Sequence, residues 1–265
     1  MEILARSGEE SGGPEKNGID LIGMIEECRS FYERSYELSG FAAQRRYPNE
    51  ELIRFMAREF FSVSPEKRSE IRILETGCGS GGNLWAIARE GFDAYGIDLS
   101  SAGISLCRRM IQSWGCNATL QTGDMTDLPY PSGFFDAVID VFSSYCLPEA
   151  DFARYLDGVE RALKPGGKYF SFTPSKNSDV FNEAAASEKI DSSTLNGIHR
   201  PTAPFYGNFY PFRFVGLEEY VSLLTKAGKG LLVVTYCETV GRTYRGGEEY
   251  FEFVVIQADK ATVSP

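Results

Sequence analysis

A run of glycines directly after a short apolar stretch constrains the fold of this chain more than any other feature. Ile71, Ile73 and Leu74 predict a buried strand, and residues 77–82 then supply a glycine-rich turn. Apolar positions within residues 84–88 continue at helical spacing. Because glycine adopts positive φ and admits a ligand close to the backbone, strand, turn and helix together predict the start of a nucleotide-binding βαβ unit.

The glycine spacing by itself leaves the ligand open. Gly77, Gly79 and Gly82 satisfy GxGxxG, the dinucleotide fingerprint, whereas Gly77, Gly79 and Gly81 equally satisfy GxGxG. Glycine turns also occur with no ligand at all. The motifs that follow along the chain therefore have to decide between these alternatives.

Strands and helices alternate regularly after the glycine turn. Further strands are predicted at 92–98, 118–122, 135–140, 168–173, 231–237 and 250–257. Helices are predicted after Ser100 and at 149–163 and 216–227. This alternation predicts an α/β fold with a Rossmann-like doubly wound sheet of about seven mostly parallel strands.

The chain divides into three predicted segments. Residues 1–18 are polar and glycine-rich and predict a disordered lead-in, and residues 19–65 show the spacing of an N-terminal helical cap. Residues 66–260 are the predicted α/β domain. Within it, residues 174–215 break the alternation and are rich in aromatic side chains, which predicts a substrate-binding insertion or lid.

Composition argues against several classes of protein. The net charge is −10 and basic residues do not cluster, which disfavours nucleic acid as a partner. No apolar run approaches the roughly 20 residues of a membrane span, and the N-terminus lacks the pattern of a signal peptide. The six cysteines are scattered without metal-ligand spacing. We therefore expect a cytoplasmic protein with no metal and no membrane partner.

Two acids follow predicted strands at the places where a nucleotide would need them. Asp98 ends the second strand about 20 residues after the glycines, which suits hydrogen bonds from ribose hydroxyls. Asp124 follows the third strand. Either aspartate could instead cap a helix or a turn.

An ordered set of motifs over residues 71–173 resembles the class I S-adenosylmethionine-dependent methyltransferases. The matching stretches are Leu74–Gly81, Gly96–Ser100, Gly123–Met125, Phe135–Val138 and Leu163–Gly167. A nicotinamide enzyme is not expected to combine the acid at Glu75, the Gly-Asp after strand three and the Leu-Lys-Pro-Gly-Gly turn.

The resemblance implies a set of cofactor contacts. Glu75 would hold the ammonium end of S-adenosylmethionine, Asp98 the ribose, Leu99 the adenine ring, and Asp124 and Met125 the adenine edge. The loop and the surrounding turns would complete the site through Gly77, Cys78, Gly79, Gly81, Val141 and Phe142. The aromatic cap would close over it through Tyr32 and Tyr36.

Catalytic and substrate residues are less constrained by the sequence. Methyl transfer is an in-line displacement in which the protein positions the nucleophile and can remove its proton. His199, the one histidine, or Asp140 could act as the base, and Tyr145 could orient the acceptor. Each could equally be structural. Candidate substrate contacts are Arg46 of the N-terminal cap and, in the insertion, Arg200, Tyr206 and Arg213.

These features predict methyl transfer from S-adenosylmethionine, yielding S-adenosylhomocysteine, to a small metabolite or glycan precursor. Oxygen is favoured over nitrogen as the attacked atom, because no Asn/Asp-Pro-Pro-Tyr/Phe motif follows strand four. The alternatives are an NAD(P)-dependent oxidoreductase and a non-catalytic module that binds S-adenosylmethionine. We expect a monomer or a homodimer.

Overall fold

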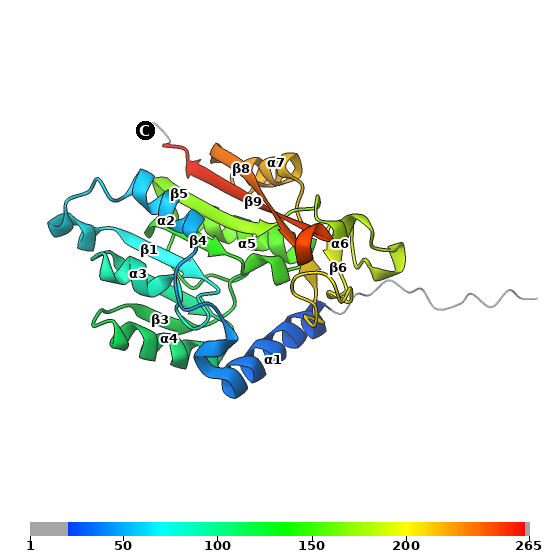
Figure 1. Cartoon of the computed structure of the whole chain (residues 1–265). Helices are drawn as coiled ribbons and strands as arrows, with labels where there is room; N and C mark the ends of the chain where they lie inside the picture. Colours follow the sequence, from blue (N-terminus) through cyan, green and yellow to red (C-terminus); the bar gives the residue numbers. More distant parts are fainter. Residues whose placement is uncertain (1–20, 263–265) are drawn as a thin grey trace, which may run out of the picture.

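Seven strands form one sheet through the middle of the molecule (Figure 1). The computed structural model describes residues 21–262, so the predicted lead-in at 1–18 lies outside the described residues. The strands are β1 (Arg72–Thr76), β2 (Asp93–Asp98), β3 (Thr119–Thr122), β4 (Phe135–Val141), β5 (Leu163–Pro174), β8 (Leu232–Tyr244) and β9 (Glu249–Lys260). Their order across the sheet is β3-β2-β1-β4-β5-β9-β8.

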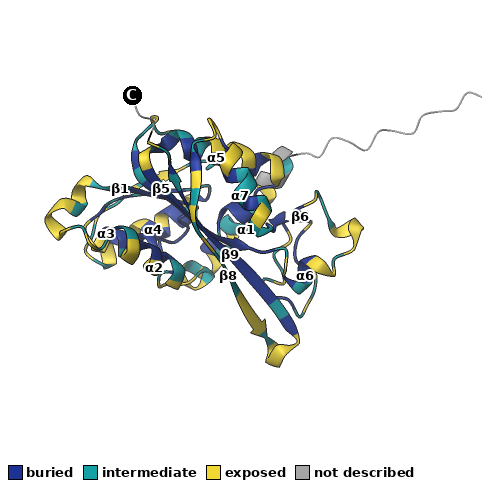
Figure 2. Ribbon diagram, turned by 90° about the horizontal axis from the view of Figure 1, so that it is seen from above, coloured by how far each residue is buried: buried dark blue, intermediate teal, exposed yellow. Residues whose placement is uncertain are grey.

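The first five strands of this sheet are parallel, and β9 pairs antiparallel with both β5 and β8. The predicted sheet of about seven mostly parallel strands is therefore confirmed. The last three strands are longer than predicted. β5 already begins at Leu163, ahead of the glycines at 166 and 167, and β8 and β9 form an extended hairpin. β9 is buried along most of its length, whereas exposed and half-buried residues alternate along much of the edge strand β8 (Figure 2).

Helices cover both faces of the sheet. They are α1 (Leu21–Ser39), α2 (Glu50–Glu59), α3 (Leu84–Arg89), α4 (Ser101–Ser113), α5 (Glu149–Ala162), α6 (Asp179–Asn182) and α7 (Leu217–Lys226). One core contains apolar residues of α2, α3 and α4, and the other contains those of α5 and α7. Successive strand residues face opposite cores, as Ile73 and Leu74 do in β1.

The two N-terminal helices have different roles. α2 packs on the sheet, where Phe55 stacks on Phe170 of β5 with ring centroids 4.8 Å apart. Its N-terminus is capped by Asn49, whose side chain accepts from two backbone N–H groups. α1 instead packs against α4, and its Glu33 accepts hydrogen bonds from Ser101 Oγ and the Ala102 N–H at the first turn of that helix. Only α1 therefore extends beyond the sheet as a cover.

The segment at 174–215 has secondary structure of its own. It contains α6 and a two-stranded antiparallel sheet formed by β6 (Thr194–Leu195) and β7 (Phe212–Arg213). A bridge between Ser175 and Val215 closes its two ends beside β5. None of the helices in the described part of the chain combines the length and apolarity that a membrane crossing requires.

Removal of the Phe55 ring tests the placement of α2. Phe55 is fully buried, so Phe55→Ala is expected to lower the free energy of unfolding by about 3–5 kcal/mol in urea titration. Ile53 on the same helix is 37% exposed, and Ile53→Ala is expected to cost at most about 1 kcal/mol. Equal losses in the two variants would contradict packing of α2 on the sheet.

Candidate functional site

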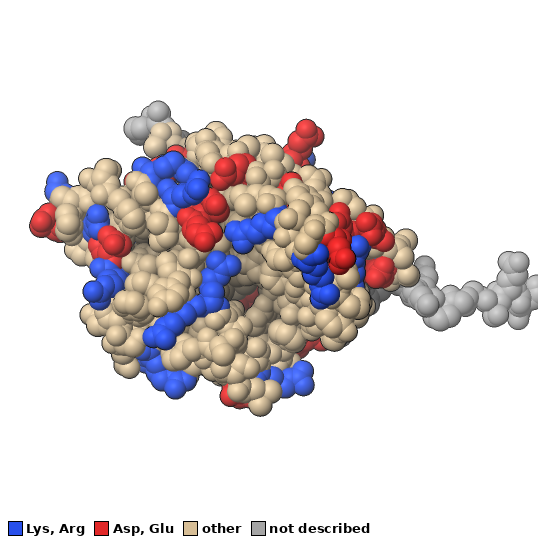
Figure 3. All heavy atoms as spheres, in the orientation of Figure 1, with Lys and Arg blue, Asp and Glu red and all other residues tan. Residues whose placement is uncertain are grey.

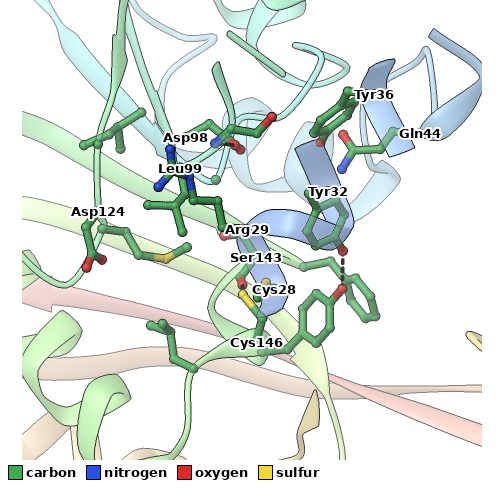
Figure 4. A pocket seen from close by; sticks show the side chains of 18 residues that line it. Cys28, Arg29, Tyr32, Tyr36, Gln44, Asp98, Leu99, Asp124, Ser143 and Cys146 are labelled. Carbon is green, nitrogen blue, oxygen red and sulfur yellow. Dashed lines mark hydrogen bonds between the residues drawn. The ribbon is translucent and has the colours of Figure 1, made fainter. Parts of the chain in front are cut away.

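Two adjoining pockets lie at the edge of the sheet where the parallel strands end. The first is lined by residues after β2 and β3 and by α1, and Figure 4 shows Tyr32 and Tyr36 of that helix across from Asp98 and Leu99. The second is lined by the end of β1, the turn after β4 and the insertion. Both contain Tyr32, Gln44, Gly77, Phe142 and Tyr145. On the surface, a hollow with basic side chains along its rim opens on the face shown in Figure 3.

The glycine loop requires glycine for two separate reasons. Gly77, Gly79 and Gly81 all have positive φ, at +64°, +50° and +85°. In addition, a Cβ on Gly77 would lie 2.2 Å from Cβ of Ser143, and one on Gly79 would lie 2.4 Å from the hydroxyl of Tyr36. The loop therefore packs directly against the turn after β4 and against α1.

Asp98 lines the first pocket and is held by two backbone groups. Its Oδ2 accepts from the Gly79 N–H and its Oδ1 from the Ser100 N–H, both at 2.8 Å. Burial raises the pKa of Asp98 to about 6, an effect that these two hydrogen bonds partly offset. The carboxylate is thus fixed at the strand end with lone pairs left for a ligand.

Glu75 lines the second pocket and is the most perturbed acid of the site. Its Oε1 accepts from Asn83 Nδ2 at 2.7 Å, whereas its Oε2 is buried without a hydrogen-bond partner among the described residues. Burial raises the pKa of Glu75 to about 8. A buried oxygen without a partner is unfavourable unless a donor occupies the pocket, so Oε2 is an acceptor open to a donor group of a ligand.

The remaining predicted cofactor residues lie around the same two pockets. Asp124 accepts from the Thr126 N–H at 2.8 Å, as a turn aspartate does, and also lines the first pocket. The first pocket further contains Leu99 and Met125, and the second contains Cys78 and Val141. Gly81 packs against Cys107 of α4 instead. The structure therefore brings the predicted cofactor residues together around the pockets, except Gly81, which lies on the side of the loop that packs on α4.

Asp140 does not face the pockets, contrary to its predicted role as a base. Its side chain is fully buried, and Oδ1 accepts from the backbone N–H of Ser143 and of Ser144 and from Ser143 Oγ. Oδ2 accepts from Ser171 Oγ at 2.9 Å and from Ser144 Oγ. These donors occupy the carboxyl group, so Asp140 organises the turn after β4.

His199 and Tyr206 lie outside both pockets. His199 is exposed, donates from Nε2 to the Asn196 carbonyl at 2.6 Å and stacks on Phe209. Tyr206 is 54% exposed. The prediction of His199 as a general base is wrong for this arrangement, because its ring is anchored on the surface of the insertion.

The predicted arginines also have other partners. Arg200 pairs with Glu249 at 3.0 Å and with Glu183, and so ties the insertion to β9. Arg213 is buried with its guanidinium 3.4 Å above the Phe152 ring and donates to the Leu147 carbonyl. Arg46 is exposed and lines neither pocket. These three therefore do not form an anion-binding group.

Tyr145 is the one predicted catalytic residue that the structure places in both pockets. It is buried, and its hydroxyl bonds to those of Tyr32 and Tyr210. Figure 4 marks the bond to Tyr32. Among residues 21–262, no three His, Cys, Asp or Glu side chains are arranged to hold a metal ion.

Sequence reasoning missed several lining residues. They are Cys28, Gln44, Arg45, Asn83, Ser143, Phe205 and Asn208. Most belong to helix ends or to the insertion, where local periodicity carries no information about which side faces a pocket. Asn83 left a usable signal, because a polar residue directly after the glycines and before an apolar helix is placed to cap or to bind.

Comparison with known proteins agrees with this geometry. Residues 73–167 match the family model described as a methyltransferase domain. The chain is 39% identical over 131 residues to a fatty-acid O-methyltransferase of Mycolicibacterium smegmatis, a match that covers 48% of the chain and 46% of that protein. It is 41% identical over 98 residues to a phthiotriol/phenolphthiotriol dimycocerosates methyltransferase of Mycobacterium leprae, covering 36% and 35%. The matches thus span less than half the length of these curated relatives.

Solved structures show the same fold at lower identity. A SAM-dependent methyltransferase from Methanosarcina mazei superposes with a TM-score of 0.61 at 22% identity, covering 72% of this chain and 93% of that one. A Burkholderia thailandensis 1,6-didemethyltoxoflavin-N1-methyltransferase with bound S-adenosylhomocysteine gives 0.58 at 14% identity, covering 95% and 93%.

Fold, motifs and comparisons define a Rossmann-like domain with a nucleotide-type pocket at the strand ends. The match of residues 73–167 to a methyltransferase domain supports the resemblance to the class I S-adenosylmethionine-dependent methyltransferases that the sequence motifs indicate, and S-adenosylmethionine is the cofactor of that family.

Substitution of Gly77 tests the close contact between the glycine loop and Ser143. Gly115 shares the same φ of +64° but has nothing within 4 Å of an added Cβ, so it is a matched control. Gly115→Ala is expected to cost about 1–2 kcal/mol of unfolding free energy from backbone strain alone. Gly77→Ala is expected to cost about 1–3 kcal/mol more, because Ser143 must move. Urea titration of both variants measures the difference, and equal losses would contradict the contact.

Proposed function

We propose that this chain transfers a methyl group from S-adenosylmethionine to an oxygen of a small acceptor that has an apolar body. When bound, the cofactor supplies an electrophilic methyl group on a positively charged sulfur. The observation that carries the proposal is the pair of adjoining pockets: one with the acids that suit an adenosine, the other with an aromatic wall. Gly77 lines both pockets, together with Tyr32, Gln44, Phe142 and Tyr145.

The residues present fit the cofactor. Asp98 would accept from the ribose hydroxyls while its backbone bonds hold it in place, and Leu99, Asp124 and Met125 would contact the adenine. The unpartnered Oε2 of Glu75 would accept from the ammonium group. These roles follow from donor and acceptor matching at the two pockets.

Arg45 offers a positive charge beside the same end of the cofactor. It lines the second pocket and makes no ion pair with any described residue. Its guanidinium would pair with the carboxylate of the cofactor or attract an anionic acceptor.

The acceptor side is aromatic and favours an apolar molecule over the glycan precursor. Phe142 has φ +55° at the turn after β4 and packs its ring 4.3 Å from Tyr145 and 4.7 Å from Phe205. Phe31 lines the same pocket from α1. Methylation at oxygen is supported by the similarity to a fatty-acid O-methyltransferase.

The two alternatives differ from this proposal in binding and in turnover. An NAD(P)-dependent oxidoreductase would bind a nicotinamide cofactor and not S-adenosylmethionine. A non-catalytic module would bind S-adenosylmethionine but transfer no radiolabelled methyl group to any acceptor in a panel of acids, alcohols and phenols. Detection of a labelled product from that panel supports the proposal against both.

Loss of the ribose-binding acid gives the first test. Asp98→Ala is expected to weaken S-adenosylhomocysteine binding at least tenfold, or about 1.4 kcal/mol, in calorimetry. Asp127 is an exposed aspartate that lines neither of these two pockets, so Asp127→Ala is expected to bind as the wild type does. Undiminished binding by Asp98→Ala would contradict its role.

The proton on Glu75 gives a second test. Because its pKa in the free protein is about 8, the carboxyl is mostly protonated at pH 6.5. An ammonium group at Oε2 favours the ionised form, so binding of S-adenosylmethionine is expected to release close to one proton at this pH. Affinity is then expected to rise up to tenfold per pH unit between about pH 6.5 and 7.5.

Glu75→Gln keeps the shape of the side chain but has no proton to release. Calorimetry in buffers of different ionisation enthalpy counts the protons, and this variant is expected to release markedly fewer protons than the wild type at pH 6.5 and to bind with a weaker pH dependence, because Asp98 with its pKa of about 6 contributes only a small part. Equal proton release by wild type and variant would show that Glu75 does not meet the ammonium group.

A further inference from the structure

Three tyrosine hydroxyls meet where the two pockets join. Tyr32 comes from α1, Tyr145 from the turn after β4 and Tyr210 from the insertion. The hydroxyl of Tyr210 lies 2.5 Å from that of Tyr145 and 2.9 Å from that of Tyr32, and Tyr32 and Tyr145 are bonded to each other. Tyr32 and Tyr145 line both pockets, whereas Tyr210 is buried and lines neither. We call these three residues the tyrosine triad.

The triad can donate hydrogen bonds to a ligand while Tyr210 stays hydrogen-bonded to Tyr32 or Tyr145. Each hydroxyl has one proton to donate, and the three bonds within the triad use all three. An anionic oxygen in the pocket would accept from Tyr32 and Tyr145, and Tyr210 could still donate to one of them. Hydrogen bonds to a charged partner are stronger than those between neutral hydroxyls, so an anion favours this rearrangement.

The triad is a set of donors and not a base. Burial raises the pKa of all three tyrosines well above its usual value, so their hydroxyls stay protonated near neutral pH. Among the residues described, the carboxyl groups that line the two pockets are Asp98 and Asp124 in the first and Glu75 in the second, where Glu75 is assigned to the ammonium group of the cofactor.

This distribution of groups selects among acceptors. An alcohol must give up a proton as it is methylated, and among the described residues that line the second pocket no imidazole and no carboxylate besides Glu75 is present to take it. A carboxylate is already ionised near neutral pH and needs only donors to hold it. Phe31, Phe142 and Phe205 provide apolar surface for the rest of such a molecule.

We infer that the tyrosine triad binds the carboxylate of the acceptor, and that the acceptors are carboxylic acids with an apolar chain or ring. This inference rests on the proposed methyl transfer. One carboxylate oxygen forms a bond to the methyl carbon as the carbon–sulfur bond breaks, and that electron pair remains on sulfur. Anion and sulfonium thereby become a neutral ester and a thioether, and no proton is released.

Equilibrium binding tests the triad without turnover. The protein saturated with S-adenosylhomocysteine is titrated calorimetrically with decanoate and with decanol. Decanoate is expected to bind at least tenfold more tightly than decanol, and Tyr145→Phe is expected to weaken decanoate binding at least tenfold while S-adenosylhomocysteine binding stays within twofold. Retained S-adenosylhomocysteine binding also shows that the variant is folded.

A second buried tyrosine pair supplies the matched control. The hydroxyls of Tyr169 and Tyr220 lie 2.9 Å apart, both residues are fully buried, and neither lines the two pockets. Tyr220→Phe therefore removes a bonded, buried hydroxyl outside both pockets, next to Tyr169, which also donates to Asp140 at 3.4 Å. It is expected to leave decanoate binding within twofold of the wild type, and a loss as large as that of Tyr145→Phe would overturn the inference.

Tyr210 acts through its two partners and is a positioning residue. Tyr210→Phe is expected to raise the KM for decanoate several-fold while the KM for S-adenosylmethionine is unchanged. A merely structural role would alter both. An unchanged KM for decanoate would remove Tyr210 from the acceptor site.

The outcomes separate this inference from the proposed function. Methyl transfer to alcohols or phenols but not to acids would overturn the carboxylate assignment and leave the methyltransferase activity standing. Equal binding of decanoate by wild type and Tyr145→Phe would overturn the role of the triad. Failure of the wild type to bind S-adenosylmethionine or S-adenosylhomocysteine would instead overturn the proposed function itself.

Discussion

The buried carboxyl of Asp140 is the group on which the site depends. Ser143 and Ser144 bond to it through backbone and hydroxyl groups, and Ser171 joins it from β5. A carboxyl group buried without such donors would be strongly destabilising, so the turn after β4 is fixed in one conformation. The fixed turn holds Ser143 against Gly77 of the glycine loop. As a result, there is no room for a side chain at position 77.

Strand register explains why two acids at strand ends have different roles. Thr76 of β1 is paired with Ile97 on one side and with Asp140 on the other. Asp140 is therefore level with the residue before Asp98 and lies one step deeper in the sheet. Its carboxyl reaches the serines beneath the pocket, whereas Asp98 reaches the pocket itself. Sequence spacing locates both acids at strand ends but does not give the register that separates them.

The sequence predicted the sheet well, and the structure gathers the predicted cofactor residues around two pockets, because both depend on local signals. These signals are the strand periodicity, the glycine spacing and the acid about 20 residues after the glycines. They depend little on how the rest of the chain packs. The acceptor side depends on which face of α1 and of the insertion turns inward. The aromatic richness of 174–215 predicts a binding segment, and Phe205 and Asn208 of that segment line the second pocket, but Tyr210 faces inward and His199 outward. Only packing distinguishes the two.

α1 contributes side chains to both pockets from one face of the helix. Tyr32 and Tyr36 lie four residues apart and so share a helix face, and Tyr36 lines the first pocket while Tyr32 reaches both. Glu33 anchors the same turn on the N-terminus of α4, where backbone N–H groups and the helix dipole favour a carboxylate. The hydrogen bonds within the triad are each worth about 0.5–1.5 kcal/mol net. Their rearrangement on ligand binding does not involve the contact between Glu33 and α4. An acceptor bound to the triad as proposed would therefore leave α1 in place over the first pocket.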